Sequence, residues 1–168
     1  DVINSGSAME LDEETIAFIK EVVKEKKIHT LWFEAHYMYR KKLASFAEQF
    51  APAKVKFRCG VETFDTALRE AWKKGIPSSV SVQDIAQHFQ GICLLCCTQG
   101  ETKEHILKDI ELAKAHFEYF SVNVFCDNHT PIKQDKELAS WFAKEIYPMI
   151  KDDPRIEVLM ENTDLGVG

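Results

Sequence analysis

The chain has 168 residues, a formal net charge of −6 and 45% hydrophobic residues. This composition suits one domain over residues 1–168, which is too short for a complete eight-unit barrel of about 250 residues. The acidic balance argues against a nucleic-acid backbone as partner, because such binding uses Lys and Arg to neutralise phosphates. The sequence shows neither a long apolar run typical of a membrane span nor a secretory signal. We therefore expect a cytoplasmic protein with reduced cysteines.

Apolar runs and amphipathic stretches alternate along the chain. The predicted strands are the apolar runs 28–35, 54–60, 91–97, 120–126 and 155–161. The predicted helices are 10–27, 39–50, 65–75, 102–117 and 136–150, with a connection and a short helix at 77–89. This alternation predicts parallel strands joined by right-handed crossovers, and so an α/β fold that is either an open sheet or a piece of a barrel.

Each predicted strand is followed by a polar group that contains a carboxylate. These groups are "FEAHY", "CGVETFD", "CTQGET", "CDNHT" and "ENTDLG". Their carboxylates are Glu34, Glu62, Glu101, Asp127, Glu161 and Asp164, and His36, Asn123, Asn128, His129 and Asn162 lie beside them. Ligands bind at the carboxyl ends of the strands in both kinds of parallel α/β fold. The sequence therefore predicts a polar pocket at this end of the sheet.

Two of these segments, "GVETFDTALREAWKKG" and "GICLLCCTQGET", resemble the radical S-adenosylmethionine (SAM) superfamily. In that superfamily a strand with a Gly-x-Glu-type tip precedes a later strand that ends in Gly-Glu-Thr. The resemblance covers roughly residues 10–164. It implies a parallel (β/α) partial TIM-type barrel with about five of six strand–helix units present. It also implies a small-molecule enzyme, with a lyase favoured, that uses SAM and a [4Fe–4S] cluster for radical chemistry.

The resemblance makes Glu62 the strand-end carboxylate that contacts the ribose or the amino group of SAM. A carboxylate suits this role because it can accept from two hydroxyls or pair with an ammonium group. Arg58, on the same strand, would pair with the ligand's carboxylate if its side chain points inward, and an outward orientation is equally compatible with the sequence.

Gly100 and Glu101 match the next tip of the family. There the glycine would admit the ligand, while Glu101 has the alternative role of starting the following helix. The family's Gly-Gly-Glu tip is replaced by "FEAHY", in which Glu34 or His36 would bind the amino group of SAM.

The family's Cys-x-x-x-Cys-x-x-Cys loop, which holds the iron–sulfur cluster, is missing from the sequence. Cys93 and Cys96 are three apart on a predicted strand, so they face opposite sides and should be buried rather than share a metal. We expect the first strand and the cluster loop to lie upstream of Asp1, the alternative being a family member that has lost the loop. Without that strand, residues 28–35 would form an unpaired edge, which predicts self-association or pairing with the missing segment.

The tip "FEAHY" and the ending "ENTDLGVG" resemble the queuine lyases within this superfamily. A guanine-like edge offers adjacent N–H donors that a buried carboxylate can accept in a fork. Asp164 or Glu161 would do so for a 7-deazaguanine-like substrate, with Asp127, Asn128 and Asn162 as further substrate contacts.

Two other functions remain open from the sequence. One is a barrel hydrolase or aldolase that uses Glu34 and His36, expected on one face of a strand, as acid and base. The other is a non-catalytic nucleotide-binding module.

Overall fold

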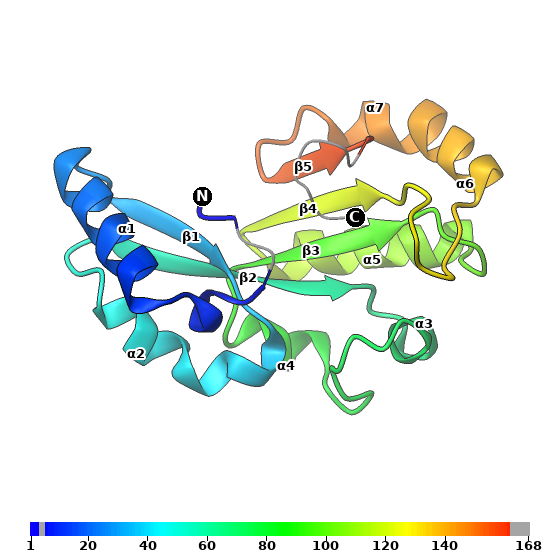
Figure 1. The fold of residues 1–168 in the computed structure, drawn as a ribbon. Helices are drawn as coiled ribbons and strands as arrows, with labels where there is room; N and C mark the ends of the chain where they lie inside the picture. The colour runs from blue at the N-terminus through cyan, green and yellow to red at the C-terminus, as the bar shows by residue number, and fades with distance from the viewer. Residues whose placement is uncertain (4–5, 162–168) are drawn as a thin grey trace.

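A computed structural model describes residues 1–3 and 6–161. Five strands form one sheet in the order β1-β2-β3-β4-β5, and every neighbouring pair is parallel. The strands are β1 (Thr30–Glu34), β2 (Lys54–Glu62), β3 (Gly91–Cys96), β4 (Tyr119–Val124) and β5 (Ile156–Leu159). The sheet curls so that one face is concave (Figure 1). This arrangement confirms the predicted α/β partial barrel.

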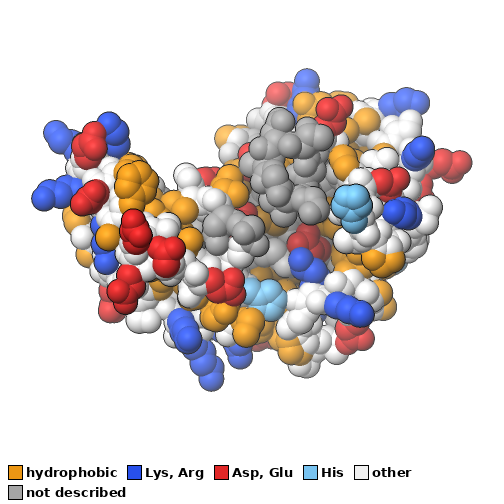
Figure 2. Space-filling model, viewed as in Figure 1, with side chains coloured by type: hydrophobic (Ala, Val, Ile, Leu, Met, Phe, Trp, Pro, Cys, Tyr) orange, Lys and Arg blue, Asp and Glu red, His pale blue; other side chains and the backbone are white. Residues whose placement is uncertain are grey.

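Helices pack on the other, convex face of the sheet (Figure 1). They are α1 (Glu13–Glu25), α2 (Leu43–Glu48), α3 (Thr66–Ala71), α4 (Val82–Ala86), α5 (Lys103–His116), α6 (Lys136–Trp141) and α7 (Tyr147–Ile150). Two 3-10 turns, η1 (Ala8–Glu10) and η2 (Tyr37–Lys42), and a π-helical turn, η3 (Phe142–Ile146), complete the elements. The space-filling view is hollowed between the α1 side and the β5 side (Figure 2). Within the described residues, none of the helices has the length and apolar character needed to cross a membrane.

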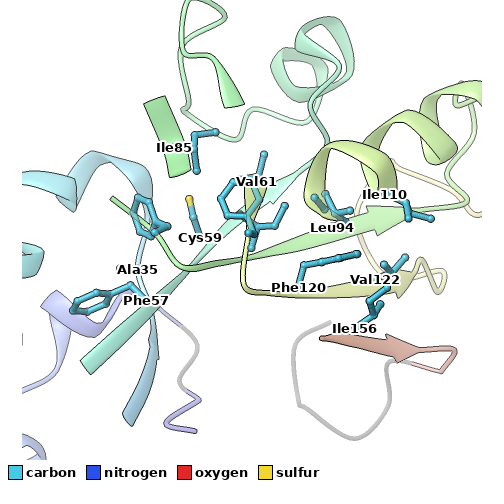
Figure 3. Close-up of a cluster of buried hydrophobic side chains, with 14 of the residues drawn as sticks. Ala35, Phe57, Cys59, Val61, Ile85, Leu94, Ile110, Phe120, Val122 and Ile156 are labelled. Carbon is cyan, nitrogen blue, oxygen red and sulfur yellow. The ribbon is translucent and has the colours of Figure 1, made fainter. Parts of the chain in front are cut away.

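The core lies between the convex face and the helices. Cys59 and Val61 of β2 lie beside Ile85 of α4, and Leu94 of β3 lies near Ile110 of α5 (Figure 3). Alternate residues of each strand enter this layer because side chains along a strand point to opposite faces. Burial of one such aliphatic side chain contributes roughly 1.5–3 kcal/mol. The other half of each strand is left to line the concave face.

The predicted helix 65–75 is shorter than expected. Asp65 caps its start by accepting from the backbone N–H of Leu68, but α3 ends at Ala71. Lys73 takes a left-handed conformation with φ of 55°, which an α-helix cannot continue, and Gly75 follows with φ of 67°. Residues 72–75 therefore form a turn rather than a last helical turn.

The first residues of the chain lie against the outer edge of β1. Val2 forms a parallel bridge with Phe33, and its N–H donates to the carbonyl of Trp32 at 2.9 Å. This single bridge occupies part of the edge that was expected to be unpaired.

Candidate functional site

The concave face carries the polar half of each strand. Its side chains come from alternate positions of the five strands and include Trp32, Glu34, Lys56, Arg58, Gly60, Glu62, Gly91, Cys93, Leu95, Tyr119, Ser121, Asn123, Glu157 and Leu159.

Glu62 is held at the end of β2 in an unusual backbone conformation. The pairing of β2 with β3 shifts register between Gly60 and Glu62, and Glu62 has φ of 66°. A bulge of this kind re-aims a side chain, and a left-handed non-glycine residue costs on the order of 1–2 kcal/mol. The carboxylate pairs with Lys74 Nζ at 2.7 Å and is largely buried. Strain of this kind concentrates at functional sites, and the role of Glu62 in ligand binding stays a prediction.

Both ring nitrogens of His36 form hydrogen bonds with backbone groups. Its Nδ1 accepts from the N–H of Met38 at 3.2 Å, and its Nε2 lies 2.7 Å from the carbonyl oxygen of Lys74. These bonds require the proton on Nε2, and they fix the turn that carries Lys74. The expectation that Glu34 and His36 share one strand face was wrong, because β1 ends at Glu34 and His36 caps the following turn, η2. The acid–base pair of a hydrolase or aldolase therefore finds no support in this geometry.

Arg58 points inward, which resolves the orientation that the sequence left open. The residue is only 3% exposed. Its Nη2 donates to Asp1 Oδ2 at 3.1 Å and lies 3.9 Å from Glu34 Oε1, while its Nη1 lies 3.8 Å from Glu157 Oε2. A buried charge is tolerated only when it is compensated, and these three carboxylates provide the compensation.

Tyr119 and Gly91 shape the space around Arg58. The Tyr119 hydroxyl donates to Glu157 Oε2 at 2.7 Å, and burial, reinforced by this bond, raises the pKa of Tyr119. A Cβ on Gly91 would lie 2.8 Å from the Tyr119 carbonyl oxygen and 3.1 Å from both Arg58 and Trp32. Because Gly91 has no side chain, the Tyr119 carbonyl oxygen, Arg58 and Trp32 can all lie close to the backbone of β3 at this position.

Cys93 lies on the same concave face, on β3. Its thiol lies 3.8 Å from Glu34 Oε1, close to Ser121, and burial followed by the charge of Glu34 raises its pKa to about 12. The thiol is therefore neutral near pH 7. Charge on this part of the concave face comes from Arg58 and the carboxylates that surround it.

Glu101 lies in the turn after β3 rather than among these side chains. It is 7% exposed, and its Oε2 accepts from the backbone N–H and the hydroxyl of Thr98 at 2.6 and 2.9 Å. Burial raises its pKa to about 7. Gly100, with φ of 94° and open space around it, belongs to the same turn. Glu101 therefore closes the turn before α5, whereas the helix itself is capped by Thr102, whose side chain accepts from the N–H of His105.

After β4, the side chains of the expected substrate residues accept hydrogen bonds from backbone N–H groups of their own loop. Asp127 Oδ1 accepts from the N–H of Gln134, and Asn128 Oδ1 accepts from the N–H of Thr130. Asp127 and Glu161 are exposed. The remaining two expected substrate residues, Asn162 and Asp164, lie outside the described residues.

The five cysteines do not form a cluster site within the described part of the chain. Cys59, Cys96 and Cys97 are buried, Cys93 faces the concave side, and Cys126 lies beyond β4. Among residues 1–3 and 6–161, three or more His, Cys, Asp or Glu side chains never come together in a way that could hold a metal ion. The cysteines present therefore do not fit a [4Fe–4S] cluster, which needs several thiolates around one centre.

Four residues of the candidate site were not predicted as such from the sequence: Lys74, Cys93, Tyr119 and Glu157. The last three lie within strands rather than at their tips. Alternation was the signal that would have found two of them: Tyr119 and Ser121 alternate with apolar residues along β4, and Glu157 stands between Ile156 and Val158.

A curled parallel sheet, covered by helices on one face and polar at its strand ends on the other, defines a ligand-binding (β/α) partial barrel. No family model matches the chain, and no curated protein matches it. Among solved structures, a queuine lyase from Clostridium spiroforme bound to SAM and queuine matches with a TM-score of 0.91 and 40% sequence identity. The match covers 99% of this chain and 72% of that chain. The chain belongs to the radical SAM superfamily, and within it to the same family as this queuine lyase.

Proposed function

We propose that the protein is a radical SAM lyase that binds SAM and a 7-deazaguanine-like base at the carboxyl ends of its strands. The observation that carries this proposal is the 40% identity with a queuine lyase over 99% of the chain. The TM-score of 0.91 over 99% of the chain supports the assignment of both ligands to the concave face described above.

Glu62 is the residue that we assign to SAM. The carboxylate and the Lys74 ammonium beside it, 2.7 Å apart, offer opposite charges to the zwitterionic end of the molecule, or Glu62 accepts from the ribose hydroxyls. Once bound, SAM would supply the radical chemistry of the superfamily, and the residues of this chain would hold it next to the substrate. His36 holds the carbonyl of Lys74 and so positions this pair.

The base is assigned to the concave face below the strand ends. Trp32 and Tyr119, with ring centroids 5.7 Å apart, give it an apolar surface. Asn123 Oδ1 is buried without a hydrogen-bond partner among the described residues, so a substrate donor there would satisfy it. Glu161 and Asp164, which follow β5, are proposed to accept from the donor edge of the base.

The described residues contain no ligand set for the iron–sulfur cluster. The residues of this chain are therefore assigned to binding and positioning alone.

An assay of the full-length, cluster-containing protein tests the proposal. The protein is incubated with SAM, a low-potential reductant and queuine, and the products are separated by liquid chromatography and mass spectrometry. We expect 5′-deoxyadenosine together with a smaller 7-deazaguanine base. Formation of 5′-deoxyadenosine without consumption of queuine, while another base is consumed, would contradict the assigned substrate.

A further inference from the structure

A second cavity lies at the other end of the sheet from the proposed SAM site. Its volume is about 620 Å³, and its walls are the second half of α1, the segment before β1 and the segment between α2 and β2. Residues 28–29 and 51–53 of this lining come just before β1 and β2, so the cavity lies at the amino ends of these strands. Small-molecule sites have volumes of roughly 300–1,000 Å³, and this cavity falls within that range.

The floor of the cavity is apolar. Val23, Phe50 and Ala53 line it and are themselves 9%, 2% and 9% exposed, and the partly buried Ile28 packs against the same core. These side chains are held in place by the core behind them. An apolar group that enters the cavity would therefore leave water for a surface that is already formed.

The rim of the cavity is basic. Lys20, Lys24 and Lys27 line it from α1 and its end, and all three are exposed. Lys20 Nζ lies 5.8 Å from the centroid of the Phe50 ring, which places this charge over the apolar floor. The described lining residues include no carboxylate, and within residues 1–3 and 6–161 none of the three lysines forms an ion pair. A chain with a net charge of −6 therefore carries an uncompensated positive rim here.

The local structure of α1 explains only one of these lysines. Lys24 lies in the last turn, where a cation compensates the partial negative charge of the C-terminal carbonyls. That effect is confined to the last turn, and Lys20 lies one turn earlier. Lys27 follows the helix with φ of 51°, a left-handed conformation that favours glycine. Two positive charges thus stand at the rim without a role in ending the helix.

We infer that this cavity binds an amphipathic organic anion, a small molecule that carries an anionic group on an apolar body. The floor would take the apolar body, and the lysine ammonium groups would bind the anionic group through charge-assisted hydrogen bonds. A neutral apolar molecule would leave the rim unused, and a small inorganic ion would leave the floor unused. The site lies at the opposite ends of the strands from Glu62, so it is separate from the proposed SAM site.

Three probes that separate the two parts of the site provide the test. Octanoate has both parts, octan-1-ol has the same apolar body without charge, and acetate has the charge without the body. Titration calorimetry of the full-length, cluster-containing protein should show one octanoate bound roughly fivefold or more tightly than octan-1-ol, with no binding of acetate at the same concentrations. Saturating SAM should leave the octanoate affinity unchanged. Equal affinity for octanoate and octan-1-ol, absence of octanoate binding, or competition by SAM would each overturn the inference.

A double substitution assigns the binding to the rim. We expect Lys20→Gln combined with Lys27→Gly to weaken octanoate roughly fivefold or more and to leave octan-1-ol within about twofold. Lys27→Gly places the favoured residue at the left-handed position, so the variant should keep the fold of wild type. Lys26→Gln is the matched control, because Lys26 pairs with Glu25 and does not line the cavity. Unchanged octanoate affinity in the double variant would show that the ligand binds elsewhere.

Sedimentation velocity of the same proteins examines the other occupant that this face could take, a second copy of the chain. We expect the double substitution and saturating octanoate to leave the oligomeric state unchanged. A dimer that the double substitution dissociates, in a protein that binds no octanoate, would assign the cavity to an interface between copies and overturn the inference.

Discussion

The carboxylate of Glu62 lies 2.7 Å from the ammonium nitrogen of Lys74, although one residue ends a strand and the other follows a helix. The contact exists because α3 stops at Ala71 and the chain turns back through residues 72–75. His36 completes it by binding the carbonyl of Lys74. The segment after β1, the end of β2 and the turn after α3 are therefore held together at the proposed SAM site.

Loss of the His36 ring should loosen this arrangement. We expect His36→Ala to lower the free energy of unfolding by about 1–2 kcal/mol, because it removes the cap of η2 and the bond to the Lys74 carbonyl. His36→Asn keeps a capping side chain and should recover part of the loss. Urea denaturation measures both, and an unchanged midpoint for His36→Ala would show that the two bonds do not stabilise the fold.

Substitution by alanine should destabilise the protein more at Gly91 than at Gly60. A Cβ at position 91 meets a backbone oxygen at 2.8 Å, whereas one at position 60 meets only Glu62 Oε1 at 3.4 Å. We expect Gly91→Ala to destabilise the protein by about 1–3 kcal/mol, and Gly60→Ala by less than about 1 kcal/mol. Denaturant titration of the two variants compares them directly. If both variants lose the same free energy of unfolding, the residues around Arg58 must shift to make room for the Cβ at position 91.

Much of the fold could be predicted from the sequence because strand and helix periods differ. Strand 54–60 was predicted from its apolar pattern, and Asp65 and Thr102 cap helices by accepting backbone N–H groups. The end of α3 could not be predicted, since Gly75 is a stronger stop signal than Lys73, yet Lys73 takes the left-handed conformation first.

The candidate site could be predicted from the sequence only in part. Glu62 follows a glycine at a strand end, but its bulge depends on the pairing of β2 with β3, which involves residues some thirty positions apart. Glu101 resembles a ligand residue in the sequence and in the structure closes a turn. Lys74 reaches the site only because a helix ends early. Contacts of this kind arise from tertiary structure and leave no local signal.

Glu101 should make stability depend on pH. Burial raises the pKa of its carboxyl group from 4.5 to about 7, so the folded state keeps a proton that the unfolded chain has already lost between these values. The contribution of this residue to the free energy of unfolding therefore falls as pH rises from about 4.5 to about 7, by an amount on the order of 3 kcal/mol.

Glu101→Gln isolates this effect because Gln can still accept from Thr98 but does not ionise. Asp109, whose pKa burial also raises, is present in both proteins. We expect the free energy of unfolding of the variant, relative to that of wild type, to be higher at pH 8 than at pH 5. A difference between the two proteins that is constant across this range would contradict the assignment.

The edge of β1 should promote self-association of the 168-residue chain. Only the Val2 bridge pairs with this edge among the described residues, and unpaired strand edges template association. Val2→Pro removes the N–H that donates to Trp32 and should increase the associated fraction, while Val2→Ala keeps the donor. Sedimentation velocity distinguishes these cases. A wild-type chain that remains monomeric at high concentration would show that the edge is adequately covered.

Binding of SAM to the full-length, cluster-containing protein tests the central claim that Glu62 at the end of β2 forms the SAM site. Titration calorimetry should show that Glu62→Gln binds SAM roughly tenfold or more weakly than wild type, because a charge-assisted interaction is lost. Glu70→Gln removes the same charge from an exposed position on the neighbouring helix α3 and should bind as wild type does. If Glu62→Gln binds SAM as tightly as the wild-type protein, the site assigned to the end of β2 is wrong.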